Sequence, residues 1–145
     1  IGRALRSVIK LDGFGERQVK LDCDVLQADG GTRTAAVTGA CVALHLAFRG
    51  LVAKGAIPRV PMTDLVAAVS AGLVAGEALL DLDYVEDSAA DADANFVLTG
   101  KGQLVEVQGT GEKAPFGRDQ FLYLLDLATE GTALLIAAQR QALGL

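Results

Sequence analysis

The sequence of 145 residues contains no Trp, one His, one Met, two Cys and three Pro. Two cysteines cannot build a disulfide framework; because Cys23 and Cys41 lie among apolar neighbours, we expect both to be core thiols in a reducing cytoplasm. A single His excludes a histidine-rich metal site. No apolar run reaches the ~18 residues of a membrane-spanning helix, and no secretory signal pattern opens the chain. These absences predict a folded cytoplasmic protein that does not cross a membrane.

Positive charge is scarce in the second part of the chain. Residues 1–60 hold nine basic and five acidic side chains, whereas residues 61–145 hold four basic and thirteen acidic ones, so +4 and −9 sum to the net charge of −5. No Lys or Arg occurs between Arg59 and Lys101. A protein that binds polyanions through overall charge would have the opposite balance. The composition therefore gives no general electrostatic argument for nucleic-acid binding.

The first part of the chain predicts a strand followed by a helix. Residues 18–25 alternate strictly between apolar and polar, which is typical of a half-buried strand. A glycine-containing turn over 27–32 follows it. From Arg33 to about Lys54 the apolar residues recur at helical spacing, and Gly55 is the expected C-terminal residue beyond the helix. The single His, at position 45, falls on the polar stripe of this helix and is expected to be an ordinary surface residue.

The remainder predicts antiparallel strands and one more helix. The apolar run 65–75 indicates a strand covered on both faces. Further short strands are expected at 80–84, 96–98 and 104–107, with hairpin turns at Gly76-Glu77 and over 99–102, followed by a helix from about Arg118. A helical apolar spacing also opens the chain over 1–9, without a capping signal, so we expect an upstream segment to be missing. This order favours a single α+β domain over 1–145, with helices packed on one sheet.

Residues Gly31, Thr32 and Arg33 form a candidate anion site between a strand end and a helix start. The N-terminus of a helix presents free N–H groups and a positive dipole, and an Arg fork binds two phosphate oxygens together. The segment matches neither of the common glycine-rich nucleotide fingerprints. From the local pattern alone, a glycine turn with a Thr cap and a solvent-facing Arg remains the other interpretation.

Asp87 and Asp93 form a candidate metal site. Carboxylates without His or Cys suit Mg²⁺ or Mn²⁺, and one or two such ligands with water suffice for magnesium. From spacing alone, an acidic surface loop is the alternative interpretation of this segment.

Three blocks of the sequence resemble bacterial ribonuclease PH. They are LDCDVLQADGGTRTA at 21–35, DYVEDSAA at 83–90 and VEVQGT at 105–110, in that family's order and spacing, and the opening IGRALR is also similar to a helix of the family. The resemblance covers nearly the whole chain. It implies a two-layer sheet-and-helix domain of the ribonuclease PH and ribosomal protein S5 domain 2-like type, incomplete at its N-terminus, because family members carry a further N-terminal portion with a second phosphate-binding arginine.

The resemblance also implies an activity and its residues. The expected activity is a phosphate-dependent 3′-to-5′ exoribonuclease that trims tRNA precursors and releases nucleoside diphosphates, with inorganic phosphate as co-substrate. Gly31, Thr32 and Arg33 would bind the phosphate, and Asp87 and Asp93 would hold Mg²⁺ or Mn²⁺. The catalytic residues that the resemblance implies are Arg33, Asp87 and Asp93. The implied assembly is a hexameric ring built as a trimer of dimers. A catalytically inactive structural or RNA-binding ring subunit of the same fold is the alternative function.

Overall fold

The computed structural model describes residues 1–145 as four helices and a four-stranded sheet, with a short 3₁₀ turn, Leu11–Phe14. The helices are α1 (Gly2–Arg6), α2 (Thr32–Ala53), α3 (Tyr84–Ala89) and α4 (Arg118–Leu143), and the strands are β1 (Val66–Val74), β2 (Glu77–Leu80), β3 (Ala92–Thr99) and β4 (Leu104–Gly111). The sheet is antiparallel throughout, in the order β2-β1-β3-β4. The α+β class predicted from the sequence is confirmed.

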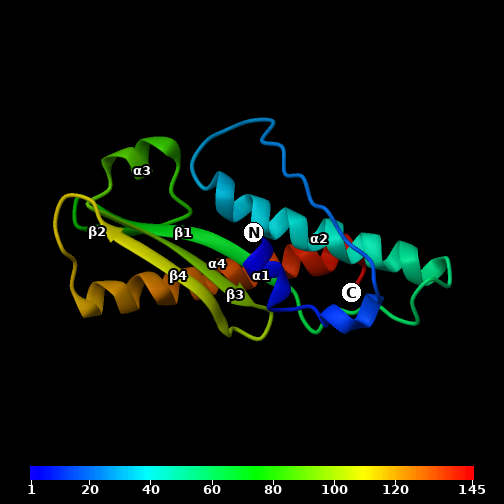
Figure 1. Cartoon of the computed structure of the whole chain (residues 1–145). Helices are drawn as coiled ribbons and strands as arrows, with labels where there is room; N and C mark the ends of the chain where they lie inside the picture. Colours follow the sequence, from blue (N-terminus) through cyan, green and yellow to red (C-terminus); the bar gives the residue numbers. More distant parts are fainter.

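The two faces of the sheet differ in chemistry. Phe96, Leu98 and their neighbours on one face pack with Leu124 and Ala128 of α4, which runs along the sheet in Figure 1. The opposite face carries Val97 and Ala68 toward α1 and α2, and farther along it becomes polar, with the cross-strand pairs Ser70–Asn95 and Asn95–Gln108. In an antiparallel pair, directly opposed residues share a face. A polar surface is therefore built into the sheet beside an apolar core.

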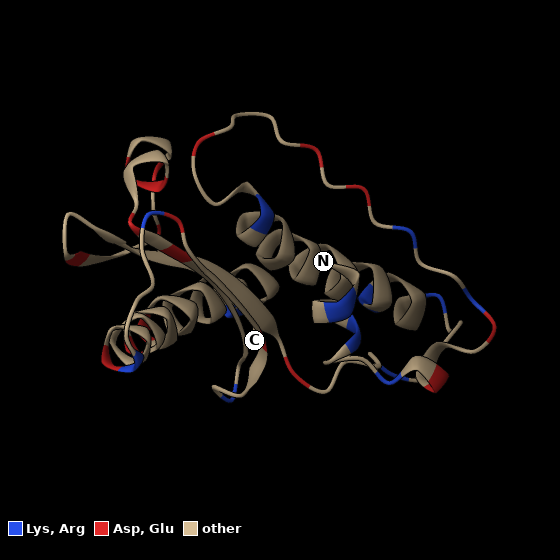
Figure 2. Cartoon of the chain, turned by 60° about the vertical axis from the view of Figure 1, so that its left-hand side comes forward, with Lys and Arg blue, Asp and Glu red and all other residues tan.

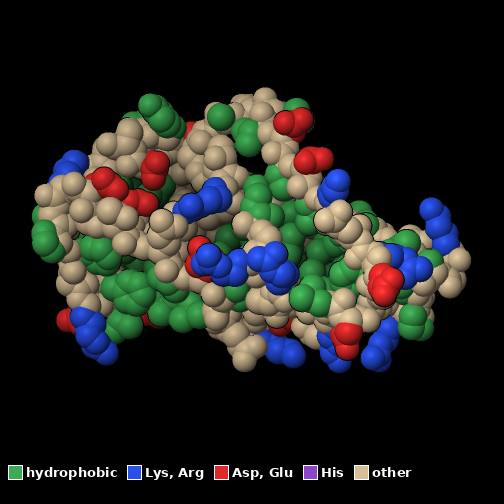
Figure 3. All heavy atoms as spheres, in the orientation of Figure 1, with side chains coloured by type: hydrophobic (Ala, Val, Ile, Leu, Met, Phe, Trp, Pro, Cys, Tyr) green, Lys and Arg blue, Asp and Glu red, His purple; other side chains and the backbone are tan.

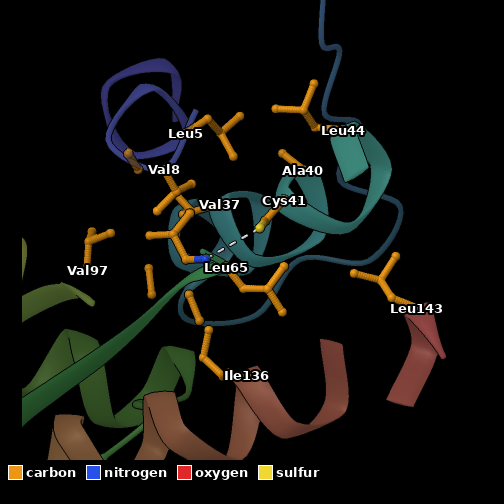
Figure 4. Close-up of a cluster of buried hydrophobic side chains, with 14 of the residues drawn as sticks. Leu5, Val8, Val37, Ala40, Cys41, Leu44, Leu65, Val97, Ile136 and Leu143 are labelled. Atoms are coloured by element: carbon orange, nitrogen blue, oxygen red, sulfur yellow. Dashed lines mark hydrogen bonds between the residues drawn. The ribbon is translucent and has the colours of Figure 1, made fainter. Parts of the chain in front are cut away.

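Helix α2 completes the core and provides hydrogen-bond partners for backbone groups on the outer edge of β1. Cys41 is fully buried among α1, α2 and Leu65, as Figure 4 shows, and its Sγ accepts a hydrogen bond of 3.4 Å from the Val66 N–H. Thr38 Oγ1 accepts from the Ala68 N–H at 3.2 Å, and Gln139 Nε2 of α4 donates to the Val66 carbonyl at 2.9 Å. These side chains replace a neighbouring strand where β2 does not reach, which avoids the cost of unpaired buried backbone groups.

The predicted strand over 18–25 is wrong. This segment pairs with none of the four strands and passes outside α2 in Figure 2, and its Asp22 and Asp24 are exposed. Val25 is 53% exposed, Leu26 is 97% exposed, and Cys23 is exposed rather than a core thiol. Alternation predicts which side chains share a face, but a strand also requires a partner for its backbone groups. No such partner lies beside this segment.

Two further expectations need correction. His45 is buried, with 8% of its surface exposed, because it lies four residues after Cys41 and three before Phe48, on the buried side of α2. The alternation over 80–84 ends at Leu80, since Asp83 and Glu86 form a capping box that begins α3 at Tyr84.

Helices α2 and α4 meet the length and composition requirements for crossing a membrane, contrary to the expectation from interrupted apolar runs. Both helices pack against the sheet instead. Core helices of soluble proteins often have such a length and apolar composition, so these two properties are weak evidence that α2 or α4 crosses a membrane.

Candidate active site

The turn before α2 is tied to α3 by one side chain. Asp29 Oδ1 accepts hydrogen bonds from the N–H groups of Gly30 at 2.9 Å and Tyr84 at 2.8 Å. A Cβ at Gly30 would lie 1.9 Å from the Leu82 carbonyl oxygen, so only glycine permits this approach of the two backbones. The contact brings the start of α3 beside the start of α2, although the two segments are about fifty residues apart in the sequence.

The start of α2 offers free backbone donors. Gly31 is the N-cap residue in a left-handed conformation, with φ of 66°, and supplies no side-chain cap. The first N–H groups of a helix have no partner within it, and the helix dipole adds positive potential there. Thr34 Oγ1 donates to the Gly31 carbonyl at 2.8 Å and so fixes the turn without occupying these donors. The geometry suits an anion.

Arg33 leaves the helix toward the polar face of the sheet. Its Nη2 donates to Gln108 Oε1 on β4 at 2.8 Å. Gln108 lies opposite Asn95, and the next pair on this face is Asp93 with Thr110. Successive residues on one face of a strand are about 7 Å apart. The guanidinium therefore lies one cross-strand pair away from Asp93.

Three carboxylates gather at that end of the sheet. Asp93 is half-buried on β3, Asp87 is exposed on α3, and Glu112 follows β4. Burial, and then the charges of Asp87 and Glu112, raise the pKa of Asp93 above its ordinary value. Lys113 forms an ion pair with Asp91 at 3.3 Å, leaving these three carboxylates without a basic partner of their own.

The donor set fits a hard divalent cation held in part by water. The negative charges of Asp87 and Glu112 raise the pKa of Asp93, and a bound cation would offset these charges. No group of three or more His, Cys, Asp or Glu side chains is arranged to hold a metal ion by itself. Magnesium commonly uses one or two carboxylates and completes its shell with water and phosphate oxygens. Asp87 and Asp93 suit that arrangement.

The structure places Arg33 one cross-strand pair from Asp93, and Asp87 close enough to Asp93 to raise its pKa, but it separates the Thr32 side chain from Arg33. Thr32 lines a groove of about 560 Å³ between α2 and the segment that precedes it, whereas Arg33 lines a different pocket. Gly31 lines a third pocket, so the three residues of the predicted anion site do not line one cavity. The sequence reasoning missed three residues: Asp29, which ties the turn to α3; Gln108, which holds Arg33; and Glu112, which acts on Asp93. Gln108 lies in the VEVQGT block and Glu112 follows it. The block was identified in the sequence, but no role was assigned to these two residues.

Comparisons with known proteins agree on one family. Residues 1–49 match domain 1, and residues 64–131 match domain 2, of the 3′ exoribonuclease family. Ribonuclease PH of Moorella thermoacetica is 61% identical over 144 residues, which are 99% of this chain and 58% of that protein. Ribonuclease PH of Methylobacterium sp. (strain 4-46) is 60% identical over 144 residues, covering 99% of this chain and 61% of that protein.

A solved structure supports the fold. The crystal structure of rice (Oryza sativa) Rrp46 aligns with a TM-score of 0.64 at 20% identity, over 83% of this chain and 52% of that one. The chain spans about three fifths of the length of the curated relatives it matches.

Proposed function

The chain belongs to the ribonuclease PH family, and from this premise we propose that it carries the phosphate site and the acidic site of a phosphate-dependent 3′-to-5′ exoribonuclease. The observation that carries the proposal is the hydrogen bond from Arg33 to Gln108, because Gln108 lies one cross-strand pair from Asp93. A guanidinium group and a cluster of carboxylates at this separation suit a reaction between phosphate and a phosphodiester.

The reaction requires few groups beyond those on this face. An oxygen of inorganic phosphate attacks the phosphorus of the last phosphodiester, and the bond from that phosphorus to the 3′ oxygen of the preceding nucleotide breaks. The terminal nucleotide leaves as a nucleoside diphosphate, and the 3′ oxygen takes up a proton. Arg33 and the N–H groups of Thr32 and Arg33 orient the attacking phosphate, which is the larger part of catalysis in phosphoryl transfer.

The acidic group has two proposed roles. Asp93, whose pKa is raised by burial and by Asp87, is the candidate acid that protonates the leaving 3′ oxygen. In their ionised state, Asp87 and Asp93 would hold Mg²⁺ or Mn²⁺, which would neutralise charge on the phosphate oxygens; the protonated and the cation-holding forms of Asp93 are separate states of the site.

The proposal includes the partners that the family implies. The substrate is the 3′ end of an RNA, with a tRNA precursor as the specific case, and the assembly is a homo-oligomeric ring, specifically a hexamer in the cytoplasm. Exposed apolar residues on α4 support an interface, since Tyr123 is 57% and Leu134 is 72% exposed. An inactive ring subunit is less well supported, because such a subunit has no chemical need for Arg33 together with Asp87 and Asp93.

The proposed function is tested by incubating the chain with an RNA of known 3′ sequence, Mg²⁺ and inorganic phosphate. We expect nucleoside diphosphates that disappear when phosphate is replaced by chloride. Arg33→Ala should raise the phosphate concentration needed for half-maximal rate roughly tenfold or more, and Arg33→Lys should recover only part of this, because lysine lacks the bidentate fork. Arg118→Ala, at the first residue of α4 with an exposed side chain, is the charge-matched control. Nucleoside monophosphates formed without phosphate would contradict phosphorolysis.

A further inference from the structure

A second cationic pocket adjoins the Arg33 site. It has a volume of about 360 Å³ and lies between α1, the first turn of α2 and the polar face of the sheet. Its charged lining consists of Arg3 and Arg6 of α1, Arg33 of α2 and Glu106 of β4. Figure 3 shows several basic side chains near the centre of this face, with acidic side chains beside them and on both sides. Three arginines thus line one hollow, and the Arg3 and Arg6 side chains are exposed to solvent.

The local charge is not neutralised within the chain. Glu106 is the one carboxylate of the lining, and its Oε2 pairs with Arg3 at 3.3 Å. Arg33 donates to the neutral Gln108, and Arg6 makes no hydrogen bond or ion pair with a protein group. Three positive charges against one negative charge leave +2 in a chain whose net charge is −5. Neighbouring like charges repel one another unless an anion lies between them.

The Arg6 guanidinium lies over the start of α1, beside Gly2. Arg6 folds back along α1, and a Cβ at Gly2 would lie 3.4 Å from Arg6 Nη1. Side chains on a helix point back toward its N-terminus, so residues four apart meet. The hollow therefore has a free guanidinium on one wall, while Asn95 adds a neutral polar group on the sheet.

We propose that Arg3 and Arg6 bind a backbone phosphate of the RNA, adjacent to the inorganic phosphate held at Arg33. The inference rests on the proposed function, because it places the RNA chain relative to that site. Arg33 lines this pocket and lies one cross-strand pair from Asp93, so the carboxylates, Arg33 and the Arg3–Arg6 pair follow one another across the face. An RNA whose last phosphodiester lies at Asp93 and Arg33 would continue over α1. A single phosphate ion would occupy either the Arg33 position or the Arg3–Arg6 position, whereas an RNA chain would place phosphates along both.

The test measures binding without turnover. The probe is a fluorescently labelled single-stranded oligoribonucleotide of about ten nucleotides, titrated with the chain in buffer without phosphate or divalent metal at several salt concentrations. Arg6→Ala should weaken binding roughly five- to tenfold and reduce the magnitude of the salt slope by about 0.7, the value for one phosphate contact to a single strand. Arg118→Ala removes the same charge from an exposed side chain at the start of α4 and should change neither quantity by a comparable amount.

A second variant acts in the opposite direction. Glu106→Gln removes the carboxylate that pairs with Arg3 and should strengthen RNA binding, an outcome that misfolding cannot imitate. Equal effects of Arg6→Ala and Arg118→Ala, or weaker binding by Glu106→Gln, would overturn the inference.

Phosphate binding separates this inference from the proposed function. Titration of inorganic phosphate, followed by ³¹P NMR, should respond strongly to Arg33→Ala and little to Arg6→Ala. Binding of inorganic phosphate at Arg6 with no effect of Arg6→Ala on RNA would also overturn the inference and leave the function standing. A native chain that binds neither phosphate nor RNA would overturn both.

Discussion

At the scale of single residues, Gly30 determines whether the two halves of the site meet. The backbones of Gly30 and Leu82 approach so closely that a Cβ would lie 1.9 Å from a carbonyl oxygen. Backbone, unlike the end of a flexible side chain, cannot move aside without displacing the start of α3.

We therefore expect Gly30→Ala to lower the free energy of unfolding by about 1–3 kcal/mol, the usual cost of overpacking, and to weaken phosphate binding. Gly50→Ala is the control, because a Cβ there meets nothing within 4 Å and the residue lies inside α2. It should stabilise the protein by about 0.5–1 kcal/mol. Urea denaturation of both variants measures this; a Gly30→Ala protein as stable as the native chain would refute the close approach.

His45 makes stability depend on pH. Burial, and then the charge of Arg49, lower the pKa of His45 below its ordinary 6.5. The unfolded chain then binds more protons than the folded chain between the folded pKa and 6.5, so the stability contributed by neutral His45 is complete above about pH 6.5 and decreases as the pH falls below it.

The measurement is denaturation at pH 7.5 and pH 5.5 for the native chain and for His45→Gln. The native chain should lose more stability between the two pH values than the variant, which has no group titrating at that position. Identical losses would show that His45 is protonated as easily in the folded state as in the unfolded state.

At the scale of elements, α3 depends on its cap. The Asp83 carboxylate accepts from the Glu86 N–H at 2.8 Å, and the Glu86 carboxylate accepts from the Asp83 N–H at 3.1 Å. The helix has only six residues and none is buried, so packing contributes little to it.

We expect Asp83→Ala to cost about 1 kcal/mol locally and to accelerate amide hydrogen exchange at 84–89, with little effect on the core strands. Ser88→Ala, which removes a hydroxyl on the same helix without touching the cap, should leave the exchange rates near native values. Unchanged exchange in Asp83→Ala would mean that the Asp29 contact alone holds α3.

The helices and strands also show which features of the fold can be predicted from the sequence. Helix α2, helix α4 and the buried strand β1 follow from spacing and capping, and all three were predicted. The segment 18–25 was predicted as a strand because alternation reports the faces of side chains and carries no information about a backbone partner. Gly31 and Arg33 were identified from local chemistry, but their tie to α3 through Asp29 and to β4 through Gln108 joins segments distant in sequence. Such pairings depend on tertiary register, which no local pattern contains.

At the scale of the whole molecule, exposed apolar surface on α4 predicts association. Leu122, Tyr123 and Leu134 are exposed on this helix, at 36%, 57% and 72%. We expect light scattering of the purified chain to give a mass well above 15.0 kDa, and Leu134→Glu to reduce it, because a charge in an apolar interface must be desolvated. Leu26→Glu, at the most exposed apolar residue of the segment before α2, is the control and should leave the mass unchanged. A monodisperse species of the chain's own mass would contradict association.

The central claim is that phosphate and a divalent cation share one site on the polar face of the sheet. The most direct test is ³¹P NMR of inorganic phosphate with the chain while Mn²⁺ is added, since a paramagnetic ion broadens only nuclei close to it. The account predicts broadening beyond that of Mn²⁺ and phosphate alone, abolished by Arg33→Ala through loss of phosphate and by Asp93→Asn through loss of metal. Phosphate bound by the native chain without such broadening, or broadening unchanged in both variants, would contradict it.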